Sequence, residues 1–89
     1  MLILCEFYIA NSKSDASRIF SGTKDAAESF VSGARSSSSV DSGSYHYYRL
    51  ANSEVLAVLV QVEDTILYIR ADKVFESDAD GIVKALGYK

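Results

Sequence analysis

Cysteine and histidine, which together can perform nucleophilic catalysis, each occur once in this 89-residue chain, as Cys5 and His46. A cysteine nucleophile needs the histidine beside it as a base, and a third group to orient that base. Nothing in the spacing of Cys5 and His46 requires them to be adjacent. Cys5 alternates with Ile3 and Phe7, which favours a small buried hydrophobic residue. A small enzyme using Cys5 and His46 stays an alternative, but we expect no enzyme, no catalytic residues, no metal and no cofactor.

An acidic tract from Glu76 to Gly81 resembles half of an EF-hand calcium loop. Glu76, Asp78 and Asp80 stand at the first, third and fifth loop positions, which supply calcium ligands. The twelfth position needs a bidentate glutamate, but this chain has Gly87 there. The same carboxylates suit the positive end of a helix dipole. The tract therefore predicts the start of a helix and no calcium site.

Tyr45, Tyr47 and Arg49 alternate along one β-rich segment, so they share one face of a predicted strand. Tyrosine and arginine often dominate the binding energy of protein interfaces, because they bury large areas and keep a polar end. The same trio could stack the bases of single-stranded nucleic acid. Nucleic-acid binding needs a positive footprint, whereas the chain has a net charge of −3. A protein interface is the preferred interpretation, with single-stranded nucleic acid as the alternative.

The charge is concentrated in the second half of the chain. Residues 54–80 contain seven acidic and two basic residues, a net charge of −5, which leaves +2 for the rest. An acidic region speeds encounter with a basic surface. We therefore expect a protein partner with a basic surface. The predicted partner-binding residues are Tyr45, Tyr47, Arg49, Asp72, Glu76, Asp78 and Asp80.

The strands that would position these residues are indicated by period-two patterns and short turns. Residues 2–9 alternate as a strand, and a further strand covers 44–50. The segment Val55–Val62 is apolar on both faces, which is typical of a central, covered strand. It pairs with Thr65–Ala71 across the polar turn Glu63-Asp64, a hairpin signal.

Helices are predicted at about 24–34, capped by Thr23, and from Ser77, with Gly87 just beyond its end. Residues 17–21 fit either a short second strand or a helical turn, and we favour the strand because Gly22 follows. The serine-rich stretch of about 35–44 is predicted to be a flexible loop that folding does not require.

Together these elements predict one compact domain over residues 1–89 of the α+β class. The order along the chain is β-β-α-β-β-β-α, with four to five strands in an antiparallel sheet and one or two helices packed on it. One cysteine cannot form an intramolecular disulfide, and no apolar stretch approaches the ~20 residues of a membrane span. With no signal-peptide pattern either, we expect a cytoplasmic protein without membrane association.

In size, acidity and α+β character the chain resembles small inhibitors encoded by phages and mobile elements, including anti-CRISPR proteins. The resemblance implies a non-enzymatic protein-binding module that occludes a basic, nucleic-acid-handling surface of its partner. A homodimer is a further expectation, because the strand at Val55–Val62 needs cover on both faces from helices or a second subunit.

Overall fold

A computed structural model describes residues 3–33, 36–43 and 45–85 and confirms the α+β class with an antiparallel sheet. The described elements follow one another in the order strand, helix, four strands and helix. Their bounds are β1 (Ile3–Ile9), α1 (Lys13–Phe30), β2 (Ser36–Ser42), β3 (Tyr45–Ala51), β4 (Val55–Val62), β5 (Thr65–Asp72), a 3-10 turn (Lys73–Phe75) and α2 (Glu76–Ala85).

The five strands form one sheet in the order β1-β5-β4-β3-β2, and every neighbouring pair is antiparallel. The predicted central position of β4 and its hairpin with β5 are confirmed. Val62 lies opposite Thr65, and the two-residue turn places Glu63 at φ 56°. Strands β1 and β2 lie at the two edges.

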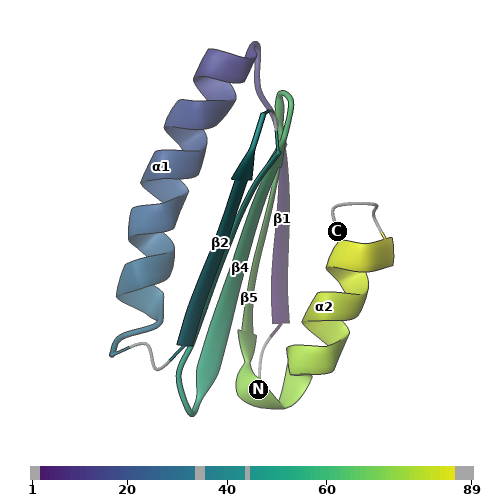
Figure 1. Cartoon of the computed structure of the whole chain (residues 1–89). Coiled ribbons are helices and arrows are strands. Elements are labelled where there is room, and N and C mark those ends of the chain that lie inside the picture. Colours follow the sequence, from purple (N-terminus) through teal and green to yellow (C-terminus); the bar gives the residue numbers. More distant parts are fainter. Residues whose placement is uncertain (1–2, 34–35, 44, 86–89) are drawn as a thin grey trace.

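The two helices cover opposite faces of the sheet, as Figure 1 shows with the sheet nearly edge-on. On one face Ala27 of α1 and its C-cap residue Val31 are buried in a cluster that includes Leu59 of β4. On the other face α2 buries Ala79 and Val83 in a cluster that includes central residues of β4 and β5. Because β4 lies between both helices, its apolar side chains are buried on both faces.

Residues 17–21 are helical, so the predicted second strand is wrong and α1 is longer than expected. Its N-cap is Ser12, whose hydroxyl accepts a hydrogen bond from the Asp15 N–H at 3.1 Å. Thr23, the predicted N-cap, lies inside the helix. The helical stripe of Ala16 and Phe20 packs with the rest of α1 on the sheet, and this burial outweighs the weak break signal of Gly22.

The serine-rich stretch forms strand β2 from Ser36 to Ser42, where a loop was predicted. It pairs with β3 along its whole length, from Ser36 opposite Ala51 to Ser42 opposite Tyr45. Strand pairing of this kind uses backbone groups, so it does not depend on apolar side chains. The ends of the predicted loop, residues 35 and 44, lie outside the described residues.

Helix α2 confirms a helix start in the acidic tract, with Glu76 as its first residue. Ser77, where the helix was predicted to start, is its second residue, because the 3-10 turn before it brings the chain into helical geometry one residue earlier. Gly87, the predicted residue beyond its end, lies outside the described residues. Neither α1 nor α2 is long and apolar enough to cross a membrane.

Candidate functional site

The predicted aromatic strand and part of the acidic tract meet on one face of the sheet. Tyr45, Tyr47 and Arg49 share the β3 face on which α2 packs, and Tyr47 belongs to the buried cluster beneath that helix. Their shared face follows from strand alternation. Where α2 docks does not follow from any local pattern, so the sequence alone could not bring the tract to this strand.

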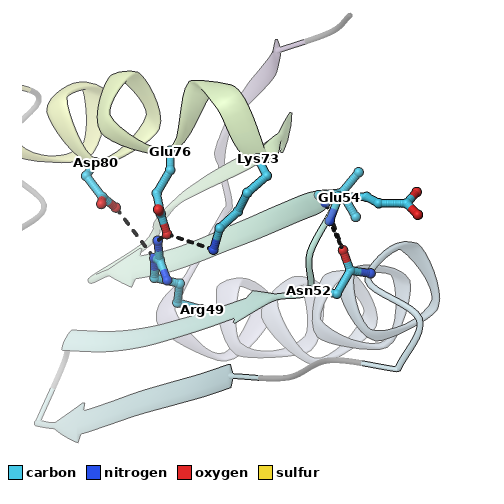
Figure 2. A network of polar contacts seen from close by, with 7 residues as sticks. Arg49, Asn52, Glu54, Lys73, Glu76 and Asp80 are labelled. Atoms are coloured by element: carbon cyan, nitrogen blue, oxygen red, sulfur yellow. Dashed lines mark hydrogen bonds and ion pairs between the residues drawn. The ribbon is translucent and has the colours of Figure 1, made fainter.

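An ion-pair network joins β3 to α2 and centres on Arg49 (Figure 2). Its Nη2 donates to Glu76 Oε2 at 2.5 Å, and its Nε lies 3.5 Å from Asp80 Oδ1. Lys73 Nζ donates to the same Glu76 oxygen at 3.1 Å. Only 18% of the Arg49 side chain is exposed, so its charge is compensated by carboxylates of the helix above it.

The network also sets the protonation of its members. Hydrogen bonds from Arg49 and from Lys73 hold the pKa of Glu76 below its ordinary value. Burial acts to lower the pKa of Arg49, but the hydrogen bond to Glu76 and the charge of Asp80 outweigh it and the pKa is raised. Burial also raises the pKa of Tyr47. At neutral pH Glu76 and Arg49 are therefore both charged, and Tyr47 beside them is neutral.

Beside this network lies an open groove of about 520 Å³ between β2, β3 and α2, which we call the α2 groove. Val40 of β2 is 50% exposed, whereas Tyr47 is 6% exposed and Tyr45 is half-buried. The β2 residues were missed because a serine-rich segment carries no apolar alternation to reveal a strand. The lining residues are Ser38, Val40, Tyr45, Tyr47, Arg49 and Asp80.

Three predicted binding residues do not line the groove: Glu76, which belongs to the ion-pair network beside it, and Asp72 and Asp78. Asp72 is the last residue of β5 and lies opposite Val55, which packs in the cluster on the α1 face. Asp78 is exposed on α2 but does not line the groove. The structure therefore brings together five of the seven predicted residues.

Cys5 and His46 cannot act on one substrate atom, because they lie on opposite faces of the sheet and two strands separate them. His46 Nδ1 lies 2.7 Å from Asp41 Oδ1, so its described partner is a carboxylate of β2. Cys5 is exposed, and the predicted burial is wrong. Its strand is at the edge of the sheet, beyond the core that α2 covers. Desolvation and the charge of Glu6 raise the pKa of the Cys5 thiol.

Among the residues that the structure describes, no three His, Cys, Asp or Glu side chains are grouped to hold a metal ion. Arg49 is engaged by Glu76 and Asp80, which does not favour a contact with phosphate. Comparisons with protein-family models, curated proteins and solved structures give no match for this chain.

Proposed function

We propose that the protein is a non-enzymatic protein-binding module whose α2 groove receives a segment of a partner protein. The observation that carries the proposal is the composition of the groove. Exposed Val40 and half-buried Tyr45 offer apolar and aromatic contact area, and Asp80 supplies a carboxylate at its rim. Aromatic anchors inside a polar rim are typical of protein interfaces.

The partner segment is basic. The side chains of Glu76 and Asp80 are 39% and 41% exposed, so both carboxylates are accessible from solvent while they pair with Arg49. Asp80 is the more weakly engaged of the two, because its closest Arg49 nitrogen is 3.5 Å away. A lysine or arginine of the partner can share this carboxylate. The net charge of −5 over residues 54–80 attracts such a segment from a distance.

The proposed action is occlusion of a basic, nucleic-acid-handling surface in the cytoplasm. A basic protein surface that handles nucleic acid has the charge that complements this acidic chain. A bound acidic protein would exclude nucleic acid from that surface and thereby inhibit its owner. This is the mode of action that the resemblance to small phage-encoded inhibitors, including anti-CRISPR proteins, implies.

The test is affinity capture from the native host, followed by binding measurements with the purified partner. Wild-type protein is compared with the double variant Tyr45→Ala, Asp80→Lys and with Asp25→Lys, which changes an exposed residue of α1 on the opposite face. We expect the groove variant to bind at least about tenfold more weakly, which corresponds to 1.4 kcal/mol. The control variant binds like wild type, and added nucleic acid competes.

Two further results complete this test. Circular dichroism and the melting temperature establish that the groove variant is folded, so a loss of binding is a loss of contact. Equal affinity of the folded groove variant and wild type for the captured partner would show that the groove is not the binding surface. Simultaneous binding of nucleic acid and of this protein would contradict occlusion.

A further inference from the structure

Strand β1 is an edge strand without the usual protection against pairing with another strand. Its described neighbour is β5, and along its other side no described strand pairs with it. Natural edges are commonly blunted by lysine, proline or a β-bulge. Strand β1 pairs with β5 without interruption from Ile3 to Ile9. The only charged residue of β1 is Glu6. The opposite edge, β2, is by contrast made of five serines, one aspartate and Val40.

The exposed side chains of β1 are large and apolar. On the face that carries α2, Ile3, Phe7 and Ile9 are 37%, 52% and 73% exposed, and on the α1 face Tyr8 is 37% exposed. Both helices pack mainly over the inner strands, so they leave this margin of the sheet in contact with water. Apolar area on both faces of one edge strand is the surface that sheet extension would bury.

The backbone of β1 defines which residues face a new strand. The Ala10 N–H donates to the Asp64 carbonyl at 2.8 Å, so residues 10 and 64 form a hydrogen-bonded pair of the antiparallel ladder. Such pairs alternate, so residues 4, 6 and 8 also direct their backbone groups toward β5. The odd-numbered residues of β1 therefore direct N–H and C=O toward the open side.

We propose that β1 pairs antiparallel with β1 of a second copy of this chain, about a two-fold axis at Phe7. Pairing requires odd residues to face odd residues, which places the axis at a residue and not between two. An axis at Glu6 sets two glutamates directly opposite, which is repulsive. An axis at Cys5 leaves Ile9, the most exposed of the apolar side chains, outside the paired segment.

With the axis at Phe7, the two β1 strands form a self-complementary interface, which we call the seam. Phe7 lies opposite Phe7 of the second copy, an aromatic cross-strand pair, and Cys5 lies opposite Ile9. Glu6 lies opposite Tyr8 of the second copy. The Tyr8 hydroxyl already donates to the Glu6 carboxylate within one chain, at 2.8 Å, and the seam offers the same donor and acceptor across the axis. The two sheets become one ten-stranded sheet with two α2 grooves.

Sedimentation equilibrium over a wide concentration range tests the pairing with a matched pair of variants. Phe7→Lys places a charge on the β1 edge, and Val40→Lys places one on the β2 edge at almost the same exposure, 52% against 50%. We expect wild type and Val40→Lys to form dimers and Phe7→Lys to be a folded monomer. Should Phe7→Lys not fold, Ile9→Lys at the 73% exposed position makes the same comparison. A monomeric wild type at all concentrations, or a dimeric Phe7→Lys, would overturn the proposal.

Cross-linking tests the position of the axis. The variant Ile9→Cys retains Cys5, and the proposed register sets these two positions opposite each other across the seam. Mild oxidation should therefore give a covalent dimer linked from position 5 to position 9, as peptide mapping can establish. In wild type the two Cys5 residues lie about 14 Å apart along the seam, which is too far for a disulfide. A dimer linked through two Cys5 residues would overturn the axis at Phe7. Neither experiment involves the α2 groove partner, so either proposal can fail alone.

Discussion

The ion pair between Arg49 and Glu76 is the residue-scale feature that attaches α2 to the sheet. Sequence alternation predicted that Arg49 shares a face with Tyr45 and Tyr47. It could not predict that Tyr47 would be buried or that carboxylates of α2 would compensate the charge of Arg49. Both depend on where a helix distant in sequence packs on the sheet. The residues of the candidate site were therefore largely predictable from the sequence, whereas their roles were not.

The substitution Glu76→Gln should lower the melting temperature by a few degrees at pH 7, because it removes the charge that Arg49 and Lys73 stabilise. The folded protein holds the pKa of Glu76 below its ordinary value of 4.5. The contribution is therefore present above about pH 4.5 and is lost as the pH falls through the lowered pKa. Thermal denaturation of both proteins from pH 7 to pH 3 should show the difference shrink toward zero.

The control for this prediction is Asp25→Asn, which changes an exposed carboxylate of α1 away from the network. Its melting temperature should follow that of wild type over the same pH range. A difference between wild type and Glu76→Gln that persists unchanged at pH 3 would show that packing, and not charge, is responsible.

At the scale of elements, the start of α1 can be tested with two substitutions of similar chemistry. Ser12→Ala removes the N-cap hydrogen bond and should cost about 1 kcal/mol, or roughly 4–8 °C in melting temperature. Thr23→Ala replaces a β-branched residue inside the helix by the best helix former and should leave stability unchanged or slightly higher. If Thr23→Ala lowered the stability and Ser12→Ala did not, the result would support the shorter predicted helix that begins after Thr23.

The layered arrangement of the sheet predicts opposite outcomes for two valines on the same face. Val58 of central β4 is 1% exposed and Val40 of edge β2 is 50% exposed. Val58→Asp buries an uncompensated charge, which costs several kcal/mol and should unfold a domain whose total stability is about 5–10 kcal/mol. Val40→Asp should change stability by no more than about 0.5 kcal/mol. A cooperative thermal transition retained by Val58→Asp would contradict the central position of β4.

The elements that could be predicted are those in which the pattern of apolar and polar side chains reflects which faces are buried. Strand β4 is apolar on both faces because two helices cover it, and its hairpin with β5 is visible as two β-rich runs around Glu63-Asp64. Strand β2 shows no such pattern, because it is held by the backbone of β3 and its residues from Ser37 to Ser42 are exposed. Residues 17–21 were ambiguous because so short a segment fits both the strand period and the helix period. Only its packing on the sheet decides between strand and helix.

At the scale of the whole molecule, the two surfaces to which we assign a role lie toward opposite edges of the sheet. The α2 groove lies toward β2 and β3, and the exposed apolar margin lies on β1 at the other edge. The acidic half of the chain supplies the helix that borders the groove. This arrangement separates partner binding from self-association, so a dimer can present two grooves and gain avidity for a repetitive or two-fold partner.

We propose that the α2 groove is the surface that recognises another protein. Amide chemical-shift mapping of the isotope-labelled protein, titrated with the captured partner, locates the binding surface residue by residue. We expect the largest shifts at 38–40, 45–49 and 76–80, and small shifts over the outer surface of α1. Shifts confined to α1, with those three segments unchanged at saturation, would show that the partner does not bind in the α2 groove.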